Sequence, residues 1–253
     1  MNIDLTGRTA LVTGATGDLG RVMARTLAQC GADVAIHYLR NGDKAGELVE
    51  QIRTMGRRAV AAQADVTDLQ SVLAMADAVR AGLGAPDIVV DNAVIQYRWT
   101  SVLEQAPEDY ESQFRSCVMQ NVHMAKAFVP AMIEKGYGRF IAISTECALQ
   151  NNPGQSAYVS GKRGMDGVLR VLAREVGPHG ITVNQVAPGW TISDRDRAAG
   201  TESNPGYEAN IPLRRRGTDR EIANAVAFLA SDLAGYITGA MLPVSGGSVM
   251  VGI

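Results

Sequence analysis

Short apolar runs alternate with longer amphipathic stretches along this chain. The first run, residues 9–13, is almost wholly apolar and is followed directly by Gly14. Such a run is typical of a parallel strand that is buried on both faces. The next stretch, residues 21–30, spaces its apolar positions like one face of a helix and stops before Gly31. The pattern therefore predicts a strand and then a helix.

The same alternation continues to the C-terminal end. Further strands are predicted over 34–38, 59–63, 88–90, 138–143, 181–186 and 241–244. Further helices are predicted over 44–55, 71–83, 108–135 with a break, 157–176 and 219–230. This alternation is typical of one parallel sheet with helices on both faces. We therefore predict an α/β fold, a single doubly wound, Rossmann-like parallel sheet of about seven strands.

One segment differs from the rest of the chain. No linker or change of composition marks a second domain, so we expect a single domain over 1–253. Residues 190–212 are polar, contain Gly200, Pro205 and Gly206, and interrupt the alternation after a strand. A substrate lid is expected at such a place, and a surface excursion without function is the alternative.

Composition and charge narrow the possible functions. Of 253 residues, 46% are hydrophobic and 20% charged, and 24 Lys and Arg against 26 Asp and Glu give a net charge of -2. This balance lacks the excess of positive charge that is typical of proteins that bind nucleic acid or an anionic membrane. Three cysteines and three histidines have neither disulfide nor metal-ligand spacing. We expect no metal, no membrane span, no signal peptide and a cytoplasmic location.

The first turn between a predicted strand and helix is rich in glycine. Gly14, Gly17 and Gly20 are spaced three residues apart. Glycines at this place let the backbone approach a pyrophosphate, which free N–H groups at the helix start can bind. The turn therefore predicts a dinucleotide site, and a tight turn that only packs a helix on a strand is the alternative.

A tyrosine and a lysine lie one helical turn apart at the start of the helix predicted over 157–176. The spacing of Tyr158 and Lys162 places a phenol and an ammonium on one face. A nearby cation stabilises tyrosinate, so Tyr158 is a candidate general acid/base.

These features occur with others in a fixed order along the chain. The additional motifs are Ala64-Asp65-Val66, Asp91-Asn92-Ala93, Asn184-x-x-Ala187-Pro188-Gly189, Ile237-Thr238-Gly239 and Gly246-Gly247. With the glycine turn and the Tyr158-x-x-x-Lys162 pair, the chain resembles the short-chain dehydrogenase/reductase family over essentially its whole length.

The resemblance implies an oxidoreductase that interconverts a ketone and a secondary alcohol of a small molecule by hydride transfer. Similar enzymes include 3-oxoacyl-[acyl-carrier-protein] reductases and sugar, polyol and steroid dehydrogenases. Reduction of a carrier-protein substrate is one alternative, for which the basic run at 214–216 could meet an acidic carrier. A dinucleotide-binding sensor or scaffold with little catalysis is the other.

The resemblance also implies a role for each catalytic residue. Tyr158 would give or take the hydroxyl proton, and Lys162 would lower the pKa of Tyr158 and bind the nicotinamide ribose. Thr145, thirteen residues before Tyr158, would polarise the carbonyl. Ser144 is the alternative if the register differs by one, and we favour Thr145 because adjacent strand residues point to opposite faces.

The resemblance implies a nucleotide that is NADP(H) in preference to NAD(H). Tyr38 occupies the place of the acid that would accept the ribose hydroxyls of NAD, and Arg40 could receive a 2′-phosphate. An ordinary exposed arginine is the alternative interpretation of Arg40. The implied cofactor contacts are Gly14, Thr16, Gly17, Leu19, Arg40, Asp65, Val66, Asn92, Ala93, Tyr158, Lys162, Pro188, Gly189 and Thr191.

Four positions depart from the family pattern. Asp18 and Val94 stand where the family places glycine, and Ser245 stands where it places aspartate. Cys117 occupies the place of the asparagine that normally holds a water in the proton relay. Asn121 could substitute only if the helix kinks or its register shifts by four. We predict a packing role for Cys117 and an altered relay.

Two further groups of residues bear on partners and substrate. Three glycines in the helix predicted over 157–176 suggest close helix packing and a homo-oligomer, a dimer or a tetramer. They are Gly161, Gly164 and Gly167. Four aromatic residues in loops are candidates for an apolar or sugar-stacking pocket. They are Tyr97, Trp99, Trp190 and Tyr207.

Overall fold

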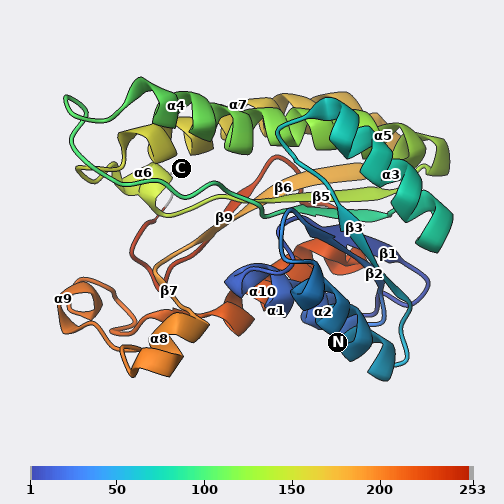
Figure 1. Ribbon diagram of the computed structural model, residues 1–253, viewed down its shortest axis with the longest axis horizontal. Coiled ribbons are helices and arrows are strands. Elements are labelled where there is room, and N and C mark those ends of the chain that lie inside the picture. The colour runs from blue at the N-terminus through green and yellow to red at the C-terminus, as the bar shows by residue number, and fades with distance from the viewer. Residues whose placement is uncertain (1, 251–253) are drawn as a thin grey trace.

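Seven parallel strands form the centre of the molecule, which was analysed as a computed structural model describing residues 2–250 (Figure 1). Their order across the sheet is β3-β2-β1-β4-β5-β6-β9, with every neighbouring pair parallel. The strands are β1 (Thr9–Val12), β2 (Asp33–Tyr38), β3 (Ala59–Gln63), β4 (Ile88–Asp91), β5 (Gly138–Ile143), β6 (Ile181–Pro188) and β9 (Met241–Val244). The predicted doubly wound, Rossmann-like sheet is confirmed.

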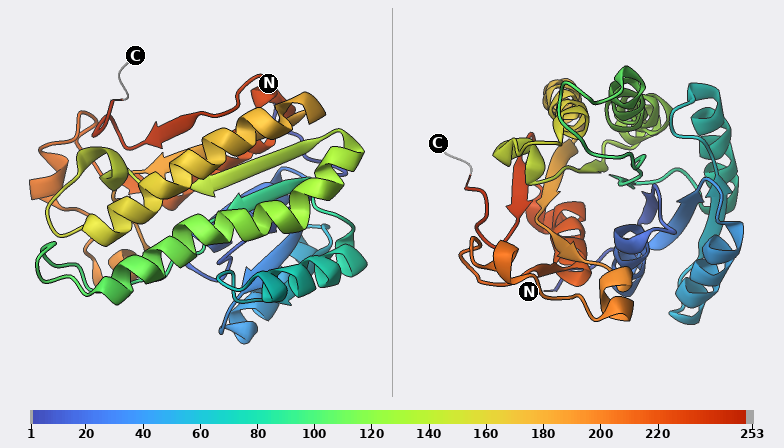
Figure 2. Two further views of the ribbon diagram at one scale, coloured as in Figure 1. Left: turned by 90° about the horizontal axis from the view of Figure 1, so that it is seen from above. Right: turned by 60° about the vertical axis from the view of Figure 1, so that its left-hand side comes forward.

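Helices cover both faces of the sheet (Figure 2). One face carries α1 (Asp18–Gln29), α2 (Gly42–Thr54) and α10 (Asp219–Ala230). The other carries α3 (Leu69–Leu83), α5 (Gln120–Lys135) and α7 (Ser156–Val176). Successive side chains of a strand point to opposite faces, so Ala10 and Val12 belong to the first core and Leu11 to the second.

The helical stretch predicted over 108–135 continues without interruption but changes its winding. It consists of α4 (Pro107–Gln113), a π-helical segment η1 (Phe114–Met119) and α5. The expected break is therefore a widened turn, which contains Cys117. π-Helical turns inside α-helices occur frequently at functional sites.

The sequence pattern did not predict the short elements. They are α6 (Cys147–Gln150), η2 (Gly177–His179), β7 (Thr191–Ile192), α8 (Asp194–Ala199), α9 (Pro205–Glu208), β8 (Gly217–Thr218) and η3 (Asp232–Ala234). Segment 190–212 carries α8 and α9 and extends from the carboxyl end of β6 to one side of the sheet (Figure 1). Its role as a lid stays a prediction.

Residues 2–250 contain neither a membrane-spanning helix nor a metal-binding cluster. None of the helices within residues 2–250 has both the length and the apolar character needed to cross a membrane. Over the same residues, no group of three or more His, Cys, Asp and Glu side chains is arranged to hold a metal ion.

Candidate active site

The glycine turn joins β1 to α1 in a geometry that larger residues cannot adopt. Gly14 has a φ of +59°, and a Cβ there would lie 3.0 Å from the Cα of Ala93. A Cβ at Gly20 would overlap the carbonyl oxygen of Gly14 and lie 2.8 Å from the Cα of Ala15. No described side chain caps α1 at Gly17, so its first N–H groups remain free for an anion. The turn therefore fits a dinucleotide pyrophosphate.

A buried histidine fixes this turn, and the sequence analysis missed it. The N–H of Gly14 donates to Nδ1 of His37 at 2.9 Å, so Nε2 carries the ring proton and donates to the carbonyl of Ala64 at 3.0 Å. Burial lowers the pKa of His37 from its ordinary value of 6.5, which keeps the ring neutral. The only signal in the sequence was a polar residue inside an otherwise apolar strand.

The carboxyl ends of β1 and β4 are joined at the point where the strand order reverses. Oγ1 of Thr13 accepts from the N–H groups of Asn92 and Ala93 at 2.8 and 3.0 Å. Nδ2 of Asn92 donates to the carbonyls of Thr13 and Gly14 at 3.0 and 3.3 Å. Ligands of open parallel sheets bind in the crevice at such a switch point. Two predicted cofactor contacts, Asn92 and Ala93, are therefore held against the glycine turn.

Tyr158 lies in the first turn of α7 at the edge of the crevice. Its backbone N–H donates to the hydroxyl of Tyr97 at 2.7 Å, and its ring stacks on Trp99 with a centroid distance of 5.9 Å. The Nζ of Lys162 lies 5.8 Å from the centroid of the Tyr158 ring and donates to the carbonyl of Ile143 at 2.6 Å. The predicted pair therefore lies beside the carboxyl end of β5.

Burial raises the pKa of Tyr158 above its ordinary value of 10. The thiols of Cys117 and Cys147 raise this pKa further, and a hydrogen bond with the Thr145 side chain lowers it. The net direction is opposite to the lowered pKa that the resemblance implies. Tyr158 is therefore protonated at neutral pH, as a free tyrosine is, and holds its proton more strongly.

Ser144 and Thr145 both follow the end of β5 rather than lying within it. The side chain of Thr145 lowers the pKa of Tyr158, and its Oγ1 accepts the N–H of Cys147 at 3.2 Å. The Oγ of Ser144 is buried with no partner among the described residues. The contact with Tyr158 favours Thr145 of the two candidates.

Asp91 is an unexpected neighbour of the catalytic pair. It is 2% exposed at the end of β4, and neither of its carboxylate oxygens has a hydrogen-bond partner among the described residues. Burial raises its pKa well above the ordinary value, and the charge of Lys162 opposes this rise. Burial therefore favours the protonated form of Asp91, whereas the charge of Lys162 favours the ionised form.

Of the two candidates for the relay position, Cys117 lies in the π-helical segment and Asn121 in the first turn of α5, and neither lines the cavity between the glycine turn and segment 190–212. Cys117 is 1% exposed, and its Sγ is 3.9 Å from Oε1 of Gln113. Nδ2 of Asn121 donates to the carbonyl of Cys117 at 2.7 Å, and its Oδ1 has no partner among the described residues. Both side chains are therefore buried among the packed helices.

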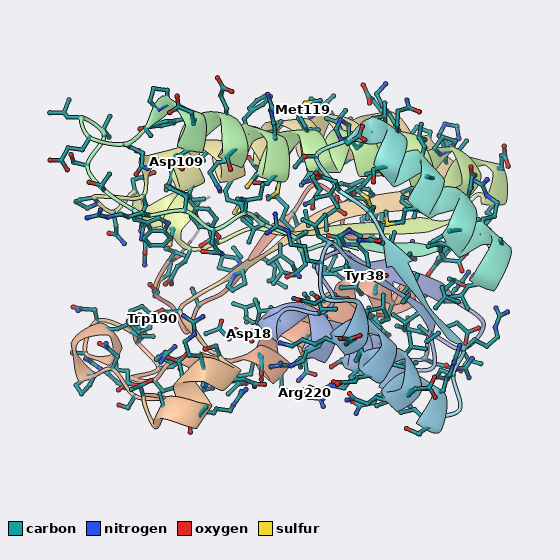
Figure 3. All side chains as sticks on the ribbon, viewed as in Figure 1. Asp18, Tyr38, Asp109, Met119, Trp190 and Arg220 are labelled. Carbon is teal, nitrogen blue, oxygen red and sulfur yellow. The ribbon has the colours of Figure 1, made fainter. Side chains whose placement is uncertain are left out.

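A cavity of about 640 Å³ connects the glycine turn to segment 190–212. It is lined by all four predicted catalytic residues and all four predicted aromatic residues. The predicted cofactor contacts that line it are Leu19, Asn92, Tyr158, Lys162, Pro188, Gly189 and Thr191. Those outside it are Gly14, Thr16, Gly17, Arg40, Asp65, Val66 and Ala93. Figure 3 labels two of the lining residues, Asp18 at the start of α1 and Trp190 near α8.

The residues predicted to contact the adenine end lie beyond this cavity. Arg40 is exposed after β2, and its side chain has no hydrogen bond or ion pair among residues 2–250. This leaves the Arg40 side chain available for an anion. Asp65 has one carboxylate oxygen already in use, because Oδ1 accepts the N–H and the hydroxyl of Thr67 at 2.9 and 2.7 Å.

Known proteins with similar sequences cover almost the whole chain. The family model described as Enoyl-(Acyl carrier protein) reductase matches residues 14–249. The 3-oxoacyl-[acyl-carrier-protein] reductase FabG of Staphylococcus aureus (strain Mu50) is 38% identical over 243 residues, which cover 96% of this chain and 98% of that protein. The FabG of Escherichia coli (strain K12) is 39% identical over 245 residues, with coverage of 97% and 98%.

Solved structures of similar fold include enzymes with different substrates. A 7 alpha-hydroxysteroid dehydrogenase complexed with NADH and 7-oxo glycochenodeoxycholic acid has a TM-score of 0.89 and 31% identity, covering 99% of this chain and 97% of its own. A gluconate 5-dehydrogenase from Burkholderia cenocepacia J2315, in complex with NADP and tartrate, has a TM-score of 0.89 and 31% identity, with coverage of 98% and 97%.

The fold and these relatives define the class of NAD(P)-dependent oxidoreductases that interconvert ketones and secondary alcohols. The family model spans nearly the whole chain, and both curated relatives exceed 30% identity. This chain belongs to the short-chain dehydrogenase/reductase family, as the motifs of its sequence predicted.

Proposed function

We propose that the chain is an NADP(H)-preferring reductase of small ketones in which Tyr158 is the general acid. Tyr158 and Thr145 both line the cavity, and this shared wall carries the proposal, because it offers two O–H groups to one carbonyl oxygen. The raised pKa of Tyr158 makes it a weaker acid than a free tyrosine, so this role requires the ammonium of Lys162 to stabilise the tyrosinate as it forms.

Each residue of the site has a separate task in this proposal. Thr145 donates a hydrogen bond to the carbonyl oxygen, and Tyr158 transfers its proton to that oxygen as the alcohol forms. The ammonium of Lys162 stabilises the tyrosinate that remains and binds the nicotinamide ribose. The glycine turn, Asn92 and Thr191 hold the nucleotide. When bound, the nicotinamide supplies the hydride for reduction and accepts it in oxidation.

The choice of nucleotide is tested by a titration of the protein with NADPH and NADH side by side, followed by intrinsic fluorescence. We expect tighter binding of NADPH, because Arg40 is exposed and has no described partner. Arg40→Ser should weaken NADPH binding about tenfold, the effect of losing roughly 1.4 kcal/mol of charged hydrogen bonding, and leave NADH binding unchanged.

The matched control for this prediction is Arg53→Ser on α2, where Arg53 pairs with Glu50 at 2.7 Å. An equal loss for NADPH and NADH in Arg40→Ser would contradict the assignment of Arg40. If the wild-type protein bound neither nucleotide, Asp18 and Val94 would have disabled the site and the proposed function would fail.

The relay position provides a second prediction. Cys117→Asn restores a side chain that donates and accepts hydrogen bonds, so we expect kcat for carbonyl reduction to rise two- to tenfold if proton transfer limits turnover. Cys117→Ala serves as the control, because we predict that the Cys117 side chain only packs and takes no part in proton transfer. Unchanged kcat in Cys117→Asn, measured by NADPH oxidation, would show that this chain does not use a relay at that position.

We propose a homo-oligomer that forms through α5 and α7. A shallow hollow of about 430 Å³ lies between these helices, lined by Val122, Ala125, Lys126, Gly167, Val168, Val171, Leu172 and Glu175. Val171 is 57% exposed, and a Cβ on Gly167 would meet no atom within 4 Å. A second copy related by a two-fold axis would cover this apolar face and bring Lys126 near Glu175 of the partner.

Val171→Glu should therefore dissociate the oligomer, because it places a charge at the centre of that apolar face. Mass photometry would show a dimer or tetramer for the wild-type protein and mainly single chains of 26.8 kDa for the variant. Leu73→Glu on α3, where the leucine is 37% exposed, is the control and should not change the mass. A wild-type protein found only at 26.8 kDa would contradict the proposal.

The alternatives have weaker support. The basic run at 214–216 does not form a free patch, since Arg215 pairs with Glu221, and Arg216 pairs with Asp196 and lies 4.5 Å over Trp190. A carrier-protein substrate is favoured only by the description of the family model and the names of the curated relatives. A sensor without catalysis would not need the Tyr158–Thr145 contact. A cytoplasmic location remains a proposal, supported by three unpaired cysteines.

A further inference from the structure

A buried carboxylate faces the cavity beside the catalytic residues. Glu146 directly follows Thr145, lines the cavity and is 4% exposed. Its Oε1 accepts a hydrogen bond from the hydroxyl of Tyr207 at 2.9 Å. Its Oε2 is buried and has no partner among the described residues. One carboxylate oxygen is thus used to hold segment 190–212, and the other is unused.

No cation neutralises this carboxylate within residues 2–250. Lys162 lines the same cavity, but its Nζ donates to the carbonyl of Ile143. The guanidinium of Arg216 lies over Trp190 and pairs with Asp196. A buried carboxylate with a single hydrogen bond is costly unless a further donor satisfies it. Glu146 lines the cavity, so a molecule bound there could supply the missing donor once the side chain turns to bring Oε2 to the cavity wall.

The neighbours of Glu146 describe that molecule further. Oε1 of Gln155, which also lines the cavity, is a second buried acceptor with no partner among the described residues. Trp190 and Tyr207 pack edge to face at 5.3 Å on the same wall. Two unpartnered acceptors next to aromatic rings match a molecule with several hydroxyl groups and an apolar C–H face. A negatively charged molecule would be repelled by Glu146.

We propose that Oε2 of Glu146 accepts a hydrogen bond from a hydroxyl of the substrate, so that the preferred substrates are neutral polyhydroxylated ketones and alcohols. This inference rests on the proposed function and adds the substrate class to it. Glu146 acts as a specificity-determining residue, while the proton and hydride transfers remain with Tyr158 and the nucleotide.

The test compares four alcohols with NADP⁺ as oxidant: xylitol, cyclohexanol, gluconate and 1-amino-2-propanol. We expect kcat/KM for xylitol to exceed that for each of the other three at least tenfold. Glu146→Gln should lower the ratio of kcat/KM for xylitol to that for cyclohexanol about tenfold, mainly through KM, and should raise the ratio for gluconate to cyclohexanol. Glu202→Gln, which removes an exposed carboxylate from the same segment as Tyr207, is the control and should change neither ratio.

Several results would overturn the inference while leaving the proposed function intact. One is oxidation of cyclohexanol by the wild-type enzyme with no preference for xylitol. Another is an unchanged xylitol-to-cyclohexanol ratio in Glu146→Gln, and a third is a preference for the amino alcohol. An equal loss for all four alcohols in both Glu146→Gln and Tyr207→Phe would assign Glu146 to holding segment 190–212 only. The proposed function itself fails separately, through absent NADPH binding or full activity of Tyr158→Phe.

Discussion

Tyr158→Phe is expected to lower kcat for carbonyl reduction about 1,000-fold and to leave NADPH affinity within about twofold, as removal of a general acid does. The ring that stacks on Trp99 is retained, so the local packing of α7 should persist. What disappears is the phenol O–H of Tyr158, which lines the same cavity as Thr145. Single-turnover reduction of a ketone, followed by NADPH absorbance, measures the loss.

The control for Tyr158→Phe removes another hydroxyl from the same end of α7. Tyr110 and Ser156 share a hydrogen bond of 2.7 Å at the start of this helix, outside the cavity. Tyr110→Phe should therefore keep nearly full activity. If Tyr158→Phe retained turnover, another group such as Ser144 would have to supply the proton. If it lost NADPH binding as well, the residue would be structural rather than catalytic.

The long elements were predictable because a buried strand or helix needs apolar residues in a regular pattern along the sequence. A parallel strand covered on both faces is apolar at most positions, as in β1, where all residues are buried. Helices longer than about ten residues repeat an apolar face often enough to be recognised. The short elements β7, α8 and α9 contain no such repeat. They depend on local caps, such as Ser193 with Asp196, that only the folded chain displays.

The residues of the site were predictable by spacing but not by environment. The distance along the chain from Thr145 to Tyr158 and Lys162 predicts a catalytic group. It does not show that burial and two thiols raise the pKa of Tyr158, because Cys117 is brought to this place by a different helix. In the same way, His37 and Asp91 are only polar residues near strand ends in the sequence, and their importance arises from neighbours far along the chain.

Glu146 illustrates the same limit at the substrate end. In the sequence it is one charged residue after a strand, where a solvated side chain is expected. Its burial results from the return of segment 190–212, which places the hydroxyl of Tyr207 on Oε1. The chemistry that is common to the family is therefore readable from local motifs, whereas the selectivity of this chain depends on contacts between distant segments.

Gly20→Ala is the second change with a large expected effect. A methyl group at this position would overlap the carbonyl oxygen of Gly14 and lie 2.8 Å from the Cα of Ala15, and both obstacles are backbone atoms. The turn must therefore move away from α1, which also disturbs the hydrogen bond from Gly14 to His37. We expect the free energy of unfolding to fall by about 3 kcal/mol, the upper part of the range for overpacking, and NADPH affinity to fall more than tenfold.

Gly46→Ala on α2 is the matched control, because a Cβ there would meet no atom within 4 Å. Alanine inside a helix is favoured over glycine by about 1 kcal/mol, so this variant should be slightly more stable than the wild type. Urea unfolding and NADPH titration of both variants decide the matter. If Gly20→Ala kept wild-type stability and lost only NADPH binding, the turn would be adaptable without ligand, and its rigidity would serve recognition alone. If it kept both, the close packing of Gly20 against Gly14 would not be what forms the pyrophosphate site.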